Sequence, residues 1–329
     1  MSEMIYRRMG PTGLKLSVFS LGSWVTFGST IDESAAKSCL LAAYENGVNF
    51  FDNAEAYGSG RAEMVVGQVL KDLRRESLVI SSKVFWGGDG PNDRGLSAKH
   101  VIEACHAALR RLQTDYLDLY YCHRPDPDTP VAETVRAMDT LVRQGKILYW
   151  GTSEWSTVQL RAAHAACAAT GAVLPTVEQP EYHLFHRHKV ETEFAPLYST
   201  PGLGLTTWSP LASGILTGKY NDEIPADSRL AHERFTWLQR SITKPRVQAV
   251  RNLEPIAREL GCTLAQLALA WCAKNVHVTS VITGASRPAQ VHENLNALRY
   301  LDQLDADVMK RIGAAVYKAQ DKPGEFDED

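Results

Sequence analysis

Four side chains with acid–base chemistry stand at the ends of three short apolar runs: Asp52 and Tyr57, Lys83, and His123. Asp52 has the parity of Phe50 in a β-strand, so it should point inward, where a carboxylate needs a partner. Lys83 is its natural partner. The parities of Lys83 and His123 within their own runs direct both toward the same side. If the three runs are neighbouring strands, these residues form one acid–base centre.

This set suits the reduction of a carbonyl group. Hydride adds to the carbonyl carbon, and the oxygen then needs a proton that Tyr57 can supply. A phenol is a weak acid at neutral pH, and a nearby ammonium is expected to lower the pKa of Tyr57. Asp52 would hold Lys83 in its charged form, and His123 would donate a hydrogen bond that polarises the carbonyl. In the reverse reaction Tyr57 would be the base for alcohol oxidation.

Each residue also has a structural explanation when taken alone. Asp52 and Lys83 could form a purely structural ion pair. Tyr57 is one of twelve tyrosines, and His123 could be an ordinary loop histidine. The functional interpretation is favoured because the residues stand together at the ends of successive runs.

A metal site is the weaker alternative. His183, His186 and His188 are close in sequence, but no acid or cysteine completes a ligand set at a standard spacing. We interpret them as surface or loop histidines and predict no metal.

The composition is that of an ordinary globular chain, with 44% apolar and 22% charged residues among 329. The net charge of −3 and the scattered basic residues give no indication of nucleic-acid binding. Six cysteines lie far apart without a CxxC pair, which predicts buried free thiols in a reducing compartment. The start of the chain has no apolar signal core, and no run is long enough to span a membrane. We therefore expect a cytoplasmic protein.

Eight apolar, β-prone runs predict strands, and nearly all are followed by a helical pattern. They begin near residues 18, 49, 78, 117, 147, 175, 204 and 277. Alternating strands and helices favour parallel pairing, and eight strands close a (β/α)8 TIM barrel. A doubly wound open sheet is the rival, but it would usually carry a G-x-G-x-x-G motif, which is absent. We expect one domain over residues 1–329, in which a hairpin at residues 5–20 comes before the barrel strands.

Helix signals accompany these runs. Asp32, Ser97, Ser156 and Thr263 can cap helices, the last as a capping box with Gln266, and Pro130 is predicted at the first position of a helix. Helices are also predicted within 189–198, at 62–73 and 287–298, and as an extra C-terminal helix at 305–319. The polar segment 213–244 is predicted to be a long functional loop with some helix.

Several stretches together resemble the aldo-keto reductase superfamily, and within it the branch of voltage-gated potassium channel β subunits and their plant and microbial relatives. They are residues 24–28 (WVTFG), 51–57 (FDNAEAY), 83–88 (KVFWGG), 123–127 (HRPDP), 149–155 (YWGTSEW) and 208–214 (WSPLASG). The resemblance spans residues 5–315. It implies a barrel closed at the bottom by the hairpin, a catalytic tetrad of Asp52, Tyr57, Lys83 and His123, and a bound NADPH or NADP⁺.

The resemblance also implies cofactor contacts at the barrel mouth. Ser153 and Gln179 would hold the carboxamide, and Trp208 would stack on the nicotinamide. The pyrophosphate would meet the segment Ser209, Pro210, Leu211, Ala212 and Ser213. Lys219 and Arg229 would fold over the cofactor. The adenosine end would meet Gly284, Ser286, Gln290, Glu293 and Asn294, with Ser286 capping the helix that follows. Trp24, Asp52 and His123 are the remaining residues expected to contact the cofactor.

An aromatic substrate pocket is expected from Trp24, Tyr57, Phe85, Trp86 and His123. Trp86 and Trp155 fit equally well in this pocket or in the packing of the barrel mouth.

Two features of the sequence depart from the family pattern. His123 stands where the animal channel subunits carry Asn, which favours catalysis. Near Ser286 the chain has Ala285 and Gln290 in place of the Lys and Arg that often surround a 2′-phosphate, although Arg287 is adjacent. We favour NADPH, as in the channel-subunit branch.

Two functions follow from the resemblance: an NADPH-dependent reductase of aldehydes and ketones, or a cytosolic potassium channel auxiliary subunit that uses the cofactor as a redox sensor. By the same resemblance we expect a homotetramer.

Overall fold

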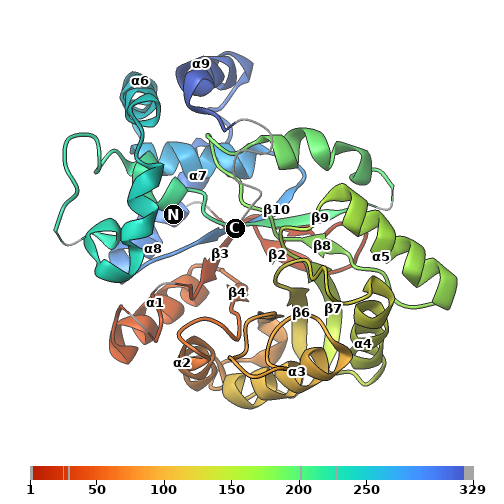
Figure 1. Cartoon of the computed structure of the whole chain (residues 1–329). Helices are drawn as coiled ribbons and strands as arrows, with labels where there is room; N and C mark the ends of the chain where they lie inside the picture. Colours follow the sequence, from red (N-terminus) through yellow and green to blue (C-terminus); the bar gives the residue numbers. More distant parts are fainter. Residues whose placement is uncertain (1–2, 25, 29, 201, 227, 322–329) are drawn as a thin grey trace.

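Eight parallel strands close into a barrel (Figure 1). The computed structural model describes residues 3–24, 26–28, 30–200, 202–226 and 228–321, so Val25 of the first similar stretch lies outside it. Around the barrel the strands follow the order β10, β3, β4, β5, β6, β7, β8, β9. Their bounds are β3 Phe19–Gly22, β4 Phe50–Asp52, β5 Val79–Val84, β6 Leu117–Cys122, β7 Ile147–Thr152, β8 Val177–Glu178, β9 Gly204–Thr207 and β10 Val278–Thr283. The closed order confirms the predicted (β/α)8 barrel and excludes the open sheet.

A ring of helices surrounds the barrel (Figure 1). Their bounds are α1 Glu33–Glu45, α2 Arg61–Leu70, α3 Ala98–Leu112, α4 Val131–Arg143, α5 Thr157–Thr170, α6 Lys244–Leu260, α7 Leu264–Lys274, α8 Pro288–Leu295 and α9 Ala306–Val316. The predicted extra C-terminal helix is α9, which packs on α6. The long segment after β9 holds short 3₁₀ helices at Ala212–Thr217, Arg229–Ala231 and Glu233–Ser241.

Helix starts follow the predicted caps. A side-chain oxygen accepts a backbone N–H of the first turn at Asp32, Ser97, Ser156 and Thr263. In α5 and α7 the Gln three residues after the cap accepts the cap residue's own N–H, which completes a capping box. The box at Thr263 was predicted, and the one at Ser156 is an addition.

Two predicted helix boundaries were wrong, the start of α4 and the end of α2. Pro130 is the N-cap of α4 and not its first residue, because its carbonyl accepts the first helical bond from Glu133 at 2.8 Å. The predicted helix within 189–198 is present, as a π-helix at Lys189–Glu193 and a 3₁₀ helix at Ala195–Leu197. Pro196 lacks the N–H that a continuing α-helix would need. Helix α2 ends at Leu70, three residues before the predicted end.

The N-terminal hairpin plugs one end of the barrel. Strands β1 (Tyr6–Arg8) and β2 (Lys15–Ser17) pair antiparallel, and Met9 and Leu16 pack inside the barrel with Phe50. The Arg7 guanidinium donates three hydrogen bonds of 2.6–3.1 Å to backbone carbonyls near the end of α7 and the start of β10. The apolar plug closes the bottom, so the polar strand ends at the opposite mouth are left for chemistry.

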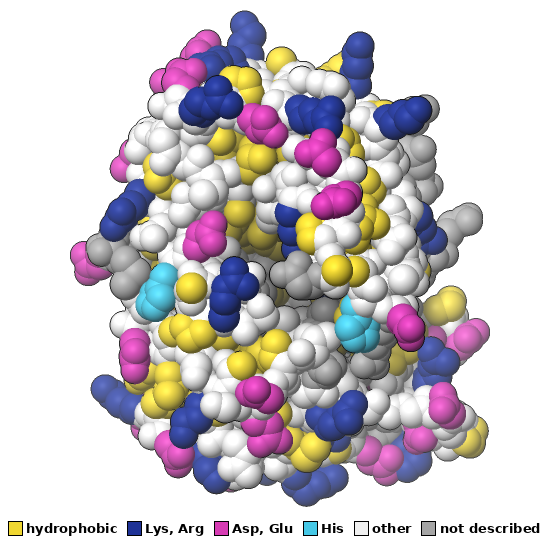
Figure 2. All heavy atoms as spheres, turned by 90° about the vertical axis from the view of Figure 1, so that its left-hand side faces the viewer, with side chains coloured by type: hydrophobic (Ala, Val, Ile, Leu, Met, Phe, Trp, Pro, Cys, Tyr) yellow, Lys and Arg dark blue, Asp and Glu magenta, His cyan; other side chains and the backbone are white. Residues whose placement is uncertain are grey.

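The six cysteines are free thiols; five are buried and Cys262 is half-buried. None of the helices in the described ranges combines the length and apolarity that crossing a bilayer requires. On the face in Figure 2, acidic and basic side chains are interspersed around a central hollow and form no single-sign patch.

Candidate active site

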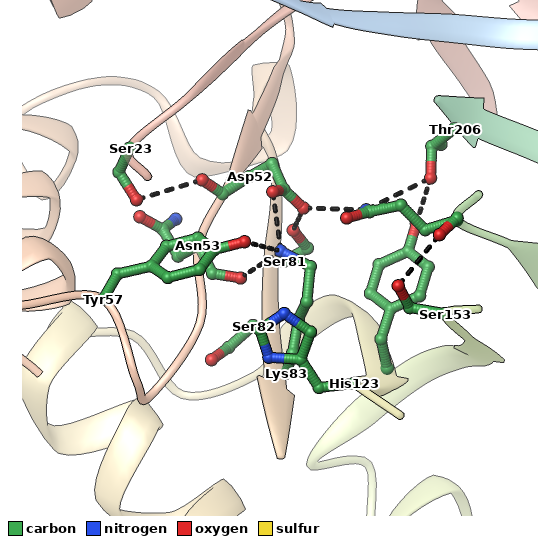
Figure 3. A network of polar contacts seen from close by, with 12 residues as sticks. Ser23, Asp52, Asn53, Tyr57, Ser81, Ser82, Lys83, His123, Ser153 and Thr206 are labelled. Carbon is green, nitrogen blue, oxygen red and sulfur yellow. Dashed lines mark hydrogen bonds and ion pairs between the residues drawn. The ribbon is translucent and has the colours of Figure 1, made fainter. Parts of the chain in front are cut away.

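Lys83 lies at the centre of the polar network drawn in Figure 3. Its side chain is completely buried, and its Nζ donates to Asp52 Oδ2 at 2.6 Å, to the Asn53 carbonyl at 2.8 Å and to the Tyr57 hydroxyl at 3.0 Å. An ammonium has three donors, so all three are used. The predicted Asp52–Lys83 pair is present, and it reaches Tyr57.

Asp52 is held from the other side by two side chains, Ser81 of β5 and Gln179 after β8. Its Oδ1 accepts the Ser81 hydroxyl at 2.9 Å and the Gln179 amide at 3.1 Å. The same amide lies 3.3 Å from Thr206 Oγ1, which in turn bonds Tyr121 at 3.0 Å. The network therefore crosses the barrel from β4 and β5 to β9 and fixes the carboxylate that faces Lys83.

The charge of Lys83 is maintained by its partners. Burial alone would lower the pKa of Lys83, but the carboxylate of Asp52 and the oxygen of Tyr57 outweigh this effect and raise it. Lys83 is therefore an ammonium at neutral pH.

The expected lowering of the Tyr57 pKa was wrong. Burial of the phenol is the largest effect and raises its pKa; Lys83 opposes this and Asp52 reinforces it. Tyr57 therefore keeps its proton at neutral pH. Burial outweighs the neighbouring cation here because an isolated phenolate would lose its hydration.

His123 lies beside Tyr57 and is neutral. Its ring centroid is 5.8 Å from that of Tyr57 and 4.8 Å from that of Trp86. Burial, together with the nearby charges of Lys83 and Arg124, holds the pKa of His123 well below its usual value. A neutral imidazole has one N–H and can still donate a hydrogen bond.

The predicted aromatic pocket residues form two groups. Phe85 contacts Trp86 edge-on at 5.0 Å, and Trp86 contacts His123. Trp24 meets Trp208 edge-on at 6.0 Å. Trp155 is buried, with 3% of its surface exposed, so it belongs to the packing and not to the pocket.

The residues expected near a nicotinamide lie together. The Ser153 hydroxyl donates to the Gln179 carbonyl at 2.8 Å, and the Gln179 side chain reaches Asp52. The Trp208 indole N–H donates to Glu154 Oε1 at 2.9 Å. These three residues follow β7, β8 and β9 and so share the barrel mouth with Tyr57.

The segment after β9 has an unusual backbone. Ser209, Ala212 and Ser213 have positive φ angles of 57°, 48° and 57°, and Gly214 follows at 96°. Non-glycine residues rarely adopt this conformation, and clusters of it mark functional sites. Left-handed and right-handed residues in succession turn backbone N–H groups toward one point, which suits an anion such as a pyrophosphate.

Two cations lie near this segment without an acidic partner. Among the described residues, neither Lys219 nor Arg229 has a carboxylate within ion-pair distance. Lys219 folds onto Gly214, and Arg229 reaches Gly284 at the end of β10. Burial lowers the pKa of Arg229. Lys219 is exposed and Arg229 is half-buried, and neither faces a carboxylate in the part of the chain that the structure describes, so both can serve a bound dianionic group.

The residues expected at the adenosine end gather where β10 meets α8. Ser286 donates from its N–H and its hydroxyl to Gln290 Oε1 at 2.8 and 3.0 Å, and Asn294 donates to the Gly284 carbonyl at 3.2 Å. The Glu293 carbonyl accepts from Gln266 at 3.1 Å. Ser286 does not cap the helix as predicted. Arg287 is the N-cap, without a side-chain bond, because α8 starts at Pro288.

Several residues of the site were missed by the sequence analysis. Ser81 and Thr206 share the inward parity of their strands, which was a usable signal. Arg124 and Glu154 directly follow predicted site residues, but their placement depends on turns. Arg124 lies over the Trp86 ring at 5.2 Å and bonds the His123 carbonyl at 2.7 Å.

The three histidines considered for a metal lie away from the tetrad. His183 is buried, with 3% of its surface exposed, and lies in the loop after β8, so of the predicted surface or loop positions it has the loop one. It bonds Glu181 at 3.1 Å, and His186 bonds Asp321 at 3.2 Å. His183 and His186 thus each have their own carboxylate.

The barrel and site define a class of protein. Residues 19–316 match the family model described as Aldo/keto reductase family, and the chain belongs to this family. A similar protein from Arabidopsis thaliana, named "Probable voltage-gated potassium channel subunit beta", is 53% identical over 327 residues, or 98% of this chain and 100% of the relative. A protein of the same name from Oryza sativa subsp. japonica is 54% identical over 324 residues, or 97% and 98%. The resemblance to this branch is confirmed.

Proposed function

We propose that this chain is an NADPH-dependent oxidoreductase that reduces aldehydes and ketones to alcohols. The carrying observation is that Lys83 uses all three donors inside the site, one of them on the Tyr57 oxygen at 3.0 Å. Its charge is therefore directed at the atom that would lose a proton. Membership of the aldo/keto reductase family supports the proposal, because its members typically bind NAD(P)H.

Tyr57 is the proposed general acid. Its oxygen accepts a hydrogen bond from Lys83, so its own proton is free to point toward a substrate carbonyl. The raised pKa keeps this proton in place until the carbonyl oxygen becomes basic. Lys83 then stabilises the phenolate that the transfer leaves, at an oxygen where the cation is already positioned.

His123 is proposed to orient the carbonyl. Because its imidazole is neutral, it donates a hydrogen bond without competing with Tyr57 as an acid. The edge-on contacts with Trp86 and Tyr57 restrict its ring to one orientation. The bound carbonyl would then lie between two donors.

The chain has residues suited to hold the cofactor, which supplies the hydride when bound. Ser153 and Gln179 would bind the carboxamide, and Trp208 would support the nicotinamide ring. The segment 209–214, with left-handed residues at Ser209, Ala212, Ser213 and Gly214, would bind the pyrophosphate. Lys219 and Arg229 would neutralise its charge. We favour NADPH over NADH because the chain resembles the channel-subunit branch, for which NADPH is expected.

The direct test mixes purified protein with NADPH and a panel of aromatic and aliphatic aldehydes. We expect aldehyde-dependent loss of absorbance at the reduced nicotinamide band, weaker with NADH. Cofactor that binds in calorimetry but shows no turnover over the whole panel would contradict the reductase proposal.

The relatives' name favours a second function, a cytosolic auxiliary subunit of a potassium channel with the cofactor as redox sensor. Co-purification of a homotetramer with the cytosolic domain of a channel would support it. Absence of the protein from membrane fractions of its own cells would count against it. The two functions are compatible, since both use the same cofactor site.

A further inference from the structure

Trp208 is held by a single side-chain hydrogen bond. Its indole Nε1 donates to Glu154 Oε1 at 2.9 Å, while its ring meets Trp24 only edge-on. The backbone of Trp208 is fixed separately, through its N–H to the Pro180 carbonyl and its carbonyl to the Tyr182 N–H. Rotation of the indole about its side-chain bonds is thus limited mainly by Glu154.

Glu154 reaches this position through an unfavourable backbone conformation. Its φ of 61° is left-handed, which costs a non-glycine residue about 1–2 kcal/mol. Such strain persists where the surroundings over-determine it, and it clusters at functional sites. Here it turns the carboxylate from the end of β7 toward the residue that follows β9.

The two carboxylate oxygens of Glu154 have different partners. Oε2 pairs with Lys189 at 2.7 Å, and the same ammonium bonds the Glu154 carbonyl at 3.1 Å. Oε1 receives the indole N–H and also the backbone N–H of Glu181 at 2.6 Å. Lys189 therefore fixes the carboxylate, and the carboxylate fixes the indole.

We propose that Glu154 is a positioning residue that sets the orientation of the Trp208 indole and, through it, the affinity for the nicotinamide cofactor. The second half of this inference rests on the proposed function, in which Trp208 supports the nicotinamide ring. The neighbouring Glu178 does not share the role, because its oxygens accept the Thr152 hydroxyl and the backbone N–H of Trp155.

The first test needs no cofactor. Protein labelled with ¹⁵N-tryptophan gives one indole N–H resonance for each of its seven tryptophans, and the loss of one in Trp208→Phe assigns Trp208. In Glu154→Ala, the proton of Trp208 should move upfield more than any other indole proton. In Glu154→Gln, which keeps an acceptor oxygen, the shift should be smaller. An unmoved Trp208 resonance in Glu154→Ala would overturn the contact.

Lys189→Met is the matched control. It removes the ion pair but leaves the Glu154 oxygen on the indole, so the Trp208 resonance should stay closer to that of the parent than in Glu154→Ala. Because Glu154→Ala leaves Lys189 without its partner, the variant could fail to fold. The double variant Glu154→Ala/Lys189→Met removes both charges and is then compared with Lys189→Met alone.

The second test is a double-mutant cycle on NADPH affinity, measured by calorimetry. Glu154→Ala should raise the Kd about tenfold, as expected for a lost hydrogen bond to a charged acceptor. In the Trp208→Phe background, which has no indole N–H, the same change should raise the Kd about twofold or less. Equal effects in both backgrounds would show a merely structural role and overturn the proposal. A parent that binds no NADPH would contradict the proposed function, while the resonance test still decides the indole contact.

Discussion

Lys83 carries a full charge inside the barrel and is completely buried. Its three acceptors replace water, and only one of them, Asp52, carries the opposite charge. The phenol of Tyr57 therefore sits against a cation whose charge is mostly balanced elsewhere. This explains why the pKa of Tyr57 stays raised: the stabilising cation is present, but the burial of the phenol is the larger effect. At the residue scale, the site therefore keeps the proton on Tyr57, and Lys83 is placed to stabilise the phenolate that remains after the proton is lost.

Replacing Asp52 by Asn should therefore destabilise the fold. The substitution keeps the shape but leaves Lys83 buried without a countercharge, which costs about 3–5 kcal/mol. Urea denaturation of both proteins measures the difference in the free energy of unfolding. Asp72→Asn changes an exposed carboxylate and serves as the control, with an effect within about 0.5 kcal/mol. Equal effects of the two substitutions would contradict the proposed role of Asp52.

At the scale of elements, turns at the strand ends are tied to the helices behind them. Between Asp52 and Tyr57, the residue Glu55 accepts the N–H of Phe85 at 2.7 Å and faces His100 of α3 at 3.4 Å. His100 also bonds the Gly95 carbonyl at 2.9 Å. One histidine thus connects the turn that carries Tyr57 with the segment that carries Trp86.

This contact should depend on pH. Burial alone would lower the pKa of His100, but Glu55, the Gly95 carbonyl and Asp93 outweigh it and raise the value. The stabilisation is therefore complete below the unfolded-state pKa of about 6.5 and is lost as the pH rises through the higher native value. Urea unfolding at several pH values should show the parent's advantage over His100→Gln shrinking as the pH rises through the neutral range. A constant difference would show that His100 does not titrate in this contact.

Two glycines allow a test of how closely strands and helices pack, because their replacement by alanine should change stability in opposite directions. A Cβ on Gly151 of β7 would lie 2.2 Å from the Val177 carbonyl oxygen, whereas one on Gly313 of α9 meets nothing within 4 Å. Gly151→Ala should force β7 and β8 apart and destabilise by about 3 kcal/mol or more. Gly313→Ala should stabilise α9 by about 0.5–1 kcal/mol. Thermal unfolding measures both, and a tolerated Gly151→Ala would contradict the close approach of the two strands.

At the scale of the whole molecule, the hairpin plug and the closed barrel leave one polar mouth. The barrel and the tetrad were predictable because strand parity and strand ends are local in sequence, and closure of eight strands then brings Asp52, Lys83 and His123 together. The hydrogen bond between Glu154 and Trp208 was not predictable, since it depends on the left-handed backbone of Glu154, which no local sequence signal requires. Burial also escaped the sequence analysis, which explains why Trp155 and His183 were left with two alternatives and why the expected pKa of Tyr57 was wrong. The start of α8 was predicted to within one residue, and only its cap was wrong, because Arg287 and not Ser286 precedes Pro288.

Lys219 and Arg229, which have no carboxylate within ion-pair distance among the described residues, lead to a binding prediction. Lys219→Met should raise the Kd for NADPH about tenfold, since one charge-assisted contact with a phosphate is lost. Lys37→Met on the outer side of α1 should leave the Kd unchanged, because Lys37 is exposed on a helix of the outer ring. Calorimetry at fixed salt compares the three proteins. Equal affinities for all three would place the phosphates elsewhere.

The central claim is that Tyr57 donates the proton, and single-turnover reduction by Tyr57→Phe tests it most directly. The variant keeps the ring and loses only the hydroxyl that Lys83 contacts, so NADPH should bind with nearly the parent's affinity. Reduction of an aldehyde that the parent turns over should fall about a thousandfold, within the range that positioned acids contribute. Tyr317→Phe, which removes an exposed hydroxyl, should reduce it at the parent's rate. Turnover by Tyr57→Phe near that of the parent would contradict the account, because the proton would then come from another group.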